Sequence, residues 1–188
     1  MPVAVPSDPV VVDLGDLTLR APRPADADAL VAAFADPDLR QWNPPPEHED
    51  GPHAAALAWI RERADWSGGI RLAWAVAEAG TGALLGSVSI RVGALAADDG
   101  SIGYWTLRAA RGRGVATRAV RAAAAFAFAE VGLHRIELAH AVANPASCRV
   151  ALAAGFPLEG TLRESHTYGD ARRHDEHLHA RLRTDLVG

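Results

Sequence analysis

The sequence predicts one α/β (α+β) domain, a mixed, mostly antiparallel sheet with helices on both faces. The expected elements run in the order strand, two helices, three strands, helix, strand, helix and two strands. Antiparallel strands can follow one another directly, whereas a strand-helix-strand segment forces a parallel pair. A chain of 188 residues without an internal repeat or a linker suffices for one sizeable core. We expect about seven strands from the hydrophobic patterns.

The first half is expected to hold one strand, two helices and a hairpin. Acidic residues in its first turn favour the first helix. A proline-rich loop, Asp36 to Asp50, separates the two helices. The expected elements are the strand Leu17 to Ala21, the helices Pro24 to Ala35 and Pro52 to Trp66, and the strands Leu72 to Glu78 and Leu84 to Val92, joined by a turn at Gly80 to Gly82.

The second half is expected to begin with a hairpin turn at Asp98 to Gly100 and to end in an antiparallel strand pair around Gly169 and Asp170. Apolar and small residues recur at helical spacing after Gly114, which predicts a long helix. Gly155 suits the left-handed end of the second helix. The expected elements are the strand Ser101 to Leu107, the helix Gly114 to Val131, the strand Arg135 to Val142, the helix Pro145 to Ala154 and the strands Leu158 to His166 and Glu176 to Leu182.

Domain organisation and location follow from the composition. Residues 1–13 are rich in Pro and Val and are expected to form a loose tail, and residues 14–188 a single domain. The tail has neither the basic region nor the cleavage site of a signal peptide. Apolar residues make up 49% of the chain, yet no run approaches the eighteen or so residues of a membrane helix. We therefore expect a cytoplasmic protein that does not bind membranes.

Charge and cysteine content exclude further classes. The formal net charge of −4 provides no basic field for nucleic acid. All nineteen basic residues are arginine. Cys148 is the only cysteine, so an internal disulfide is impossible, and a packing role is commoner than a nucleophilic one.

The junction between an expected strand and helix at Arg111 to Ala116 is typical of a phosphate site. Its small residues let the backbone approach a ligand, and the first N–H groups of a helix lack intrahelical partners and carry positive potential. A P-loop is excluded because the chain contains no lysine, and a dinucleotide fingerprint would place its third glycine at Thr117. The alternative is a glycine-rich turn with two solvated arginines.

Three motifs in order carry a family resemblance. The junction matches the pattern [RQ]-x-x-G-x-[GA] with Arg111, Gly114 and Ala116; I-G-Y-W precedes it at Ile102 to Trp105; and N-P-A-S at Asn144 to Ser147 is followed by V-A-L-A-A-G-F and E-G-T-L-R. Together they resemble the GNAT N-acetyltransferases of the RimJ/RimL-like branch, which act on ribosomal proteins. The resemblance spans roughly Leu17 to Leu186 and is strongest over its second half.

The resemblance implies a GNAT fold whose two central parallel strands splay apart, and acetyl-CoA (coenzyme A) as the acyl donor. The pantetheine arm would lie between those strands. Its partners would be the main chain of Trp105, Thr106 and Leu107 on one side and the side chain of Asn144 on the other. The residues that would hold the pyrophosphate are Arg111, Gly112, Arg113, Gly114, Val115, Ala116 and Thr117.

The resemblance also implies the catalytic residues. The serine that matches Ser147 faces the cofactor sulfur, so Ser147 is the expected proton donor to the leaving thiolate, with helix capping as the alternative role. His166 stands where the branch can place a glutamate base, and histidine suits proton transfer at neutral pH. Glu164 or an ordered water is the alternative base. A free N–H on the segment Trp105 to Leu107 is the expected oxyanion donor.

The acceptor side has weaker signals. Trp42 lies in the loop that forms the acceptor wall in GNAT folds, next to acidic residues that include Glu47 and Glu49. These acids would attract a cationic amine, or they form only a solvated helix start. The pattern H-x-x-H-x-H at His174 to His179 offers two histidines on one strand face, and without a cysteine or a third ligand we predict no metal.

We therefore expect an acyl-CoA N-acyltransferase that transfers acetyl from acetyl-CoA directly to a primary amine. The acceptor is a protein N-terminus or a small-molecule amine, amine-bearing antibiotics included. The alternatives are a longer acyl donor such as succinyl-CoA and a CoA-binding regulatory module without turnover. The protein is expected to be a monomer or a homodimer.

Overall fold

The computed structural model describes residues 3–93 and 97–185. One sheet of eight strands, in the order β1-β2-β3-β4-β5-β6-β8-β7, forms the centre of the molecule. All neighbouring strands are antiparallel except β5 and β6, which run parallel. The strands are β1 Val12–Asp13, β2 Leu17–Arg20, β3 Arg71–Glu78, β4 Leu84–Val92, β5 Asp99–Thr106, β6 Arg135–Ala141, β7 Leu158–Thr167 and β8 Arg173–Leu182.

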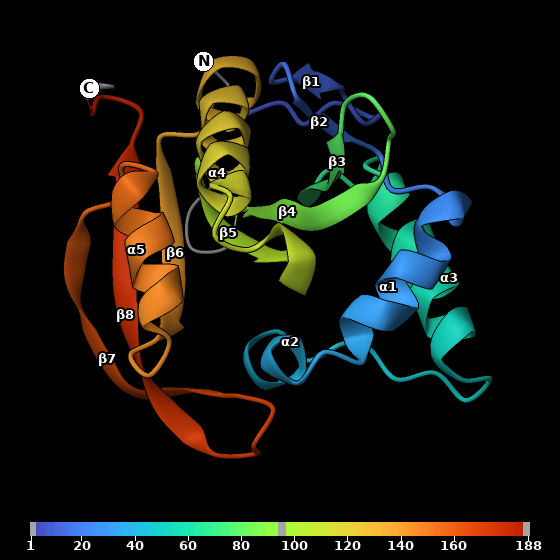
Figure 1. Cartoon of the computed structure of the whole chain (residues 1–188). Helices are drawn as coiled ribbons and strands as arrows, with labels where there is room; N and C mark the ends of the chain where they lie inside the picture. The colour runs from blue at the N-terminus through green and yellow to red at the C-terminus, as the bar shows by residue number, and fades with distance from the viewer. Residues whose placement is uncertain (1–2, 94–96, 186–188) are drawn as a thin grey trace.

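Helices cover both faces of this sheet, as the sequence predicted (Figure 1). The α-helices are α1 Ala27–Phe34, α2 Pro37–Trp42, α3 Pro52–Ala64, α4 Val115–Phe126 and α5 Pro145–Ala153. Short 3-10 turns, η1 Pro24–Asp26 and η2 Arg108–Ala110, precede α1 and α4, and a π-helical turn, η3 Ala127–Val131, continues α4.

Alternate residues of β3 show why the two faces have separate cores. Trp74 packs edge-on against Phe126 of α4, with ring centroids 5.5 Å apart. Its neighbour Ala75 belongs instead to the apolar cluster of α1 and α3, together with Trp59. Since successive side chains of a strand point to opposite faces, one strand supports both helical layers.

The parallel pair β5 and β6 separates soon after it forms. Only three residue pairs join the two strands, from Asp99↔Arg135 to Ser101↔Glu137. Beyond Ser101, β5 stays paired with β4 as far as Thr106, and β6 stays paired with β8 as far as Ala141. The splayed parallel strands expected from the sequence are therefore present, and a wedge opens between their carboxyl ends.

The first correction concerns the N-terminal segment, which was expected to be a loose tail. Val12–Asp13 pairs with β2 as β1, the N–H of Ala4 donates to the carbonyl of Val131, and the indole N–H of Trp74 donates to the carbonyl of Val10. Val3, Val5 and Val12 pack against the α4 core, whereas Val10 and Val11 are exposed, and the pairing of Val12–Asp13 accounts for the eighth strand.

Two further corrections concern loops. The expected loop Asp36 to Asp50 contains α2, because Asp36 caps it by accepting a hydrogen bond from the N–H of Asp38, and Pro37 suits a first helical turn. The expected turn at Asp98 to Gly100 overlaps the start of β5, which begins at Asp99. Part of this connection, residues 94–96, lies outside the described residues.

The turn between β7 and β8 contacts α2 on the other side of the wedge. The N–H of Gly169 donates to the carbonyl of Gln41 over 2.9 Å, and the rings of Trp42 and Tyr168 meet edge to face at 5.4 Å. A Cβ at Gly169 would lie 2.0 Å from the carbonyl oxygen of Arg40. The close approach therefore requires glycine at this position.

No helix among the described residues is both long and apolar enough to cross a membrane.

We expect Gly169→Ala to weaken this contact and to lower the free energy of unfolding by about 1 to 3 kcal/mol, the usual cost of overpacking. The matched control is Gly160→Ala on β7, where an added Cβ meets nothing within 4 Å. Chemical denaturation of both variants is the measurement. If Gly169→Ala were as stable as Gly160→Ala, the contact between this turn and α2 would not depend on glycine at position 169.

Candidate active site

A cleft of about 610 Å³ lies between the start of α4, the end of β5 and the first turn of α5. Its volume falls in the usual range for small-molecule and cofactor sites. The expected cofactor-binding residues that line it are Trp105, Thr106, Arg111, Gly112, Gly114, Val115, Ala116, Thr117, Asn144 and Ser147. Leu107 and Arg113 are absent from the lining. The N–H of Leu107 donates to the carbonyl of Leu85, and Arg113 lies 3.7 Å from Glu78.

The N-terminus of α4 borders the cleft. Gly114 is the N-cap residue in the left-handed conformation, with φ of 72°, and its carbonyl accepts the first helical hydrogen bond from the N–H of Arg118. The N–H groups of Val115, Ala116 and Thr117 therefore have no acceptor within the helix. Together with the helix dipole they favour a phosphate group at this end.

Arg111 lies at the edge of the cleft but does not extend freely into it. Its guanidinium forms two ion pairs of 2.7 Å, with Asp36 and with Asp38. Asp36 is also the N-cap of α2, so this contact connects the start of α2 to the loop before α4. The phosphate contact expected of Arg111 stays a prediction, since its guanidinium contacts two carboxylates here while the residue still lines the cleft.

Tyr104 and Ser147 meet where the cleft joins a smaller cavity. Their hydroxyl oxygens are 2.7 Å apart, and either group can donate. Burial raises the pKa of Tyr104 to about 12, although its hydrogen bond with Ser147 opposes that shift. Tyr104 therefore keeps its proton at neutral pH and is able to donate it. The serine does not cap α5, because the carboxamide oxygen of Asn144 does so by accepting from the N–H of Ser147.

Sequence analysis did not assign a role to Tyr104. The fold brings its hydroxyl to Ser147 from β5. The sequence feature that could have identified Tyr104 is its place in I-G-Y-W, at the end of a strand next to the expected phosphate loop.

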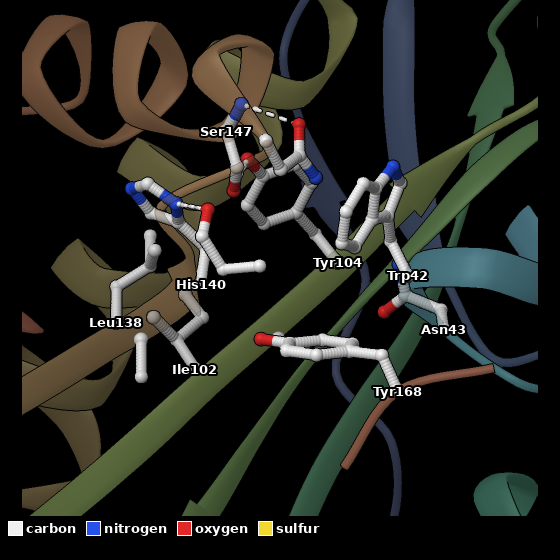
Figure 2. Close-up of a pocket in the computed structure, with 12 residues that line it drawn as sticks. Trp42, Asn43, Ile102, Tyr104, Leu138, His140, Ser147 and Tyr168 are labelled. Atoms are coloured by element: carbon white, nitrogen blue, oxygen red, sulfur yellow. Dashed lines mark hydrogen bonds between the residues drawn. The ribbon is translucent and has the colours of Figure 1, made fainter. Parts of the chain in front are cut away.

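The smaller cavity, of about 60 Å³, occupies the wedge between β5 and β6. Figure 2 shows the rings of Trp42, Tyr104 and Tyr168 around it, with Asn43 beside Trp42. Tyr168 donates its hydroxyl proton to Glu176 over 2.7 Å, and its pKa is raised, chiefly by burial and also by that carboxylate. Trp42 lines both cavities, which agrees with its expected place on the acceptor side.

His140 also lines the smaller cavity, and both of its ring nitrogens contact protein atoms. Its Nδ1 contacts the carbonyl of Ala141 at 2.8 Å, and its Nε2 lies 3.2 Å from Nε2 of His179. Burial lowers the pKa of His140, despite the opposing effect of the Ala141 carbonyl. Because both nitrogens are directed at protein atoms, we do not assign His140 as a base for the acceptor.

The main chain of β5 determines which N–H groups face the wedge. Because the N–H of Leu107 donates to Leu85, and hydrogen-bonded pairs alternate along an antiparallel ladder, the N–H of Trp105 also points to β4. The N–H groups of Tyr104 and Thr106 then point toward β6. Within the segment Trp105 to Leu107, which was expected to supply the oxyanion donor, only Thr106 directs its N–H toward the wedge. The N–H of Tyr104, just before that segment, points the same way.

The remaining expected residues lie apart from these cavities. His166 is exposed on β7, and its ring contacts Tyr168 with centroids 4.7 Å apart. Glu164 is exposed with φ of 46°, and Glu47 and Glu49 are exposed in the loop after α2. None of the four lines either cavity. A role as base for His166 or Glu164 stays a prediction that this geometry does not support.

Comparison with known proteins decides the family. The model of the acetyltransferase (GNAT) domain matches residues 16–157. The chain belongs to the GNAT acetyltransferase family. It is 31% identical over 133 residues to YdaF of Bacillus subtilis, a protein named as a ribosomal N-acetyltransferase, and the match covers 69% of this chain and 68% of YdaF.

Solved structures agree with this assignment. RimJ of Mycobacterium smegmatis, in complex with a CoA disulfide, superposes with a TM-score of 0.77 at 27% identity, covering 97% of this chain and 86% of RimJ. A GNAT acetyltransferase of Bacillus anthracis has a TM-score of 0.80 at 20% identity, over 94% of this chain and all of its own. This GNAT protein is an acyl-CoA N-acyltransferase of the RimJ/RimL-like branch, as the motifs indicated.

We expect Ser147→Ala to lower kcat by roughly 10- to 100-fold with little change in KM for the donor, because proton donation to the leaving thiolate strengthens in the transition state. Tyr104→Phe should lower kcat in the same direction. Since the two hydroxyls act as a unit, the double variant should be no slower than the slower single variant. Steady-state kinetics of the three variants is the measurement. If the double variant lost kcat by the product of the two single losses, the hydroxyls of Ser147 and Tyr104 would act independently.

The pH dependence of kcat/KM is a second test of the Tyr104–Ser147 pair. Because the pKa of Tyr104 is about 12, its hydroxyl stays protonated from about pH 6 to pH 10, and Tyr104→Phe should change the height of the kcat/KM profile but not its limbs. A limb that disappears in Tyr104→Phe would mean that Tyr104 titrates in this range and acts as a base.

Proposed function

We propose that this protein transfers acetyl from acetyl-CoA to the α-amino group at the N-terminus of a polypeptide. The observation that carries the proposal is the junction of two spaces at Tyr104 and Ser147. A large cleft with an anion-binding helix end meets a small cavity between splayed strands there. The two substrates of a direct transfer would approach the hydroxyl pair from these two sides.

The cleft supports CoA as the donor. Backbone N–H groups of α4 would bind the pyrophosphate, and the edges of β5 and β6 leave room for an extended pantetheine arm between them. The solved RimJ relative holds a CoA disulfide. The 60 Å³ of the smaller cavity favours an acetyl group over a longer acyl chain such as succinyl.

The lining of the smaller cavity supports an α-amine as the acceptor. Its polar groups are the hydroxyls of Tyr104, Ser147 and Tyr168 and the amides of Asn43 and Asn144, with both nitrogens of His140 already in use. No carboxylate belongs to this lining. An amine with a pKa near 7.8 is about 14% neutral at pH 7, against about 0.04% for a lysine amine near 10.4. The site would therefore suit an amine that needs little help from a base.

The proposed transfer proceeds in one chemical step on this chain's residues. The neutral amine attacks the thioester carbonyl, and the N–H groups of Tyr104 and Thr106 on the wedge side of β5 stabilise the oxyanion. The C–S bond then breaks. Ser147 protonates the leaving thiolate and takes a proton from Tyr104, while water receives the proton of the new amide nitrogen and returns one to Tyr104, so that addition and C–S cleavage complete a direct transfer without an acyl-enzyme.

A polypeptide N-terminus agrees with the surroundings of the cavity. Trp42 and Tyr168 close it from α2 and from the β7–β8 turn, and the exposed acids Glu47 and Glu49 lie a few residues beyond Trp42. These acids would attract a cationic N-terminal segment before it enters. The name of YdaF points to ribosomal proteins as the acceptor class to be tested first.

The donor site is tested by Ala116→Glu. A carboxylate at the second position of α4 favours the helix through its dipole but repels a phosphate in the cleft, so affinity for CoA should fall by about 100-fold or more. Ala125→Glu, at an exposed position of the same helix, is the matched control and should bind CoA as the parent does. Calorimetric titration with CoA measures both. Equal affinities would place the CoA phosphates elsewhere.

The acceptor is tested with paired peptides. At pH 7 a peptide with a free N-terminus and no lysine should react with a kcat/KM on the order of 10²-fold above that of an N-terminally blocked peptide with one lysine, because their neutral fractions differ by that order. The first peptides should carry the N-terminal sequences of ribosomal proteins. Thiol release from acetyl-CoA, compared with succinyl-CoA, is the measurement. Preference for the lysine peptide would contradict the proposed acceptor.

A further inference from the structure

Four potential metal ligands converge where α5 lies over β6 and β8 (Figure 1). His140 comes from β6, His177 and His179 from β8, and Cys148 from the second turn of α5. One ligand atom from each lies within 4.8 Å of the other three. The sequence analysis predicted no metal because H-x-x-H-x-H lacked a cysteine and a third ligand, and the fold brings both from distant segments.

Hydrogen bonds orient the two buried histidines toward one point. His179 is completely buried and His140 is 5% exposed. A carbonyl oxygen only accepts, so Nδ1–H of His140 donates to Ala141 and Nδ1–H of His179 donates to Phe156, at 2.8 and 2.9 Å. Each neutral ring then has a lone pair on Nε2. These two nitrogens face each other at 3.2 Å, an arrangement that requires a positive centre between or beside them.

The other two side chains leave donor atoms at the same place. Nδ1 of His177 is buried and has no hydrogen-bond partner within residues 3–93 and 97–185. Its ring meets that of His140 edge to face, with centroids 5.4 Å apart. The thiol of Cys148 is half-buried and free of any disulfide. An unpartnered buried nitrogen costs free energy, which a bound cation would recover.

We propose that His140, His177, His179 and Cys148 bind a zinc ion. Three imidazoles and one thiolate suit this borderline-soft cation, and donation of Nδ1–H to a carbonyl is the usual support for a histidine that binds through Nε2. Tetrahedral zinc with Zn–N near 2.0 Å and Zn–S near 2.3 Å separates its ligand atoms by about 3.3 to 3.6 Å. The two Nε2 atoms are already close to that spacing, at 3.2 Å, and the ligand atoms of all four residues lie within 4.8 Å of one another.

Four protein ligands leave no open position, so the zinc would be structural. It would join the first turns of α5 to β6 and β8 on the side of the wedge. Cys148 follows Ser147 directly, so the ion would hold in place the helix turn that carries the proposed proton donor. This inference rests on the ligand geometry alone and does not depend on the proposed acceptor.

The test uses the full chain, first treated with a chelator and then titrated with zinc chloride against a chromophoric chelator. We expect one tightly bound ion per chain. Cys148→Ser and His177→Gln, which spare the two most buried ligands, should each weaken binding by more than about 100-fold, since loss of outer hydrogen-bond partners alone costs about 10- to 100-fold. His134→Gln, a histidine outside the cluster, is the matched control and should bind zinc as the parent does.

Cobalt chloride gives a readout that is specific for the thiolate. The parent and His134→Gln should show a sulfur-to-cobalt charge-transfer band together with the visible bands of tetrahedral Co²⁺, and Cys148→Ser should lose the charge-transfer band. Circular dichroism confirms that each variant is folded. A parent that binds no zinc, or a Cys148→Ser variant that binds zinc as tightly as the parent, would overturn the proposal and leave a proton shared by His140 and His179 as the positive centre.

Discussion

The separation of β5 from β6 after three residue pairs is the constraint on which the rest of the site depends. A parallel pair that ended at the sheet edge would leave its backbone groups to solvent, but here each strand keeps its outer partner, β4 or β8. The sheet therefore stays continuous while a wedge opens inside it. The N–H groups of Tyr104 and Thr106 face this wedge, and α4 and α5 begin at its mouth. Main-chain donors, a helix dipole and a hydroxyl pair thus share one space.

Segments distant in the sequence close this space. Arg111 holds the start of α2 through Asp36 and Asp38, and the turn after β7 reaches α2 through Gly169. Both contacts position Trp42, which lines the cleft and the smaller cavity. Movement of α2 would therefore change the acceptor side and the edge of the donor side together. The cleft and the smaller cavity are thus both bordered by one short helix, α2, and its last residue Trp42.

Periodicity predicted the regular elements well where a single rule applied. The bounds of β4 agree with the alternating pattern, and Gly155 takes the left-handed conformation expected at a helix end, with φ of 85°. The short elements were missed because they depend on contacts rather than on pattern. α2 lies within a proline-rich segment, and β1 contains two residues that only pairing with β2 makes into a strand. His166, which stands where the branch can place a glutamate base, lines neither cavity and contacts only Tyr168 of the smaller cavity's lining, on a strand whose pairing with β8 is interrupted by register shifts.

The sequence by itself determined the family and the fold and predicted a phosphate loop, because those depend on local order: glycines and small residues between a strand and a helix, and asparagine with proline at a helix start. The tertiary structure decided which side chains meet. Tyr104 reaches Ser147 across 43 residues of sequence, and His140, Cys148 and His179 converge from three elements. Such encounters depend on strand register and on the angle of a helix over a sheet, and both are set by packing of the whole core rather than by neighbours along the chain.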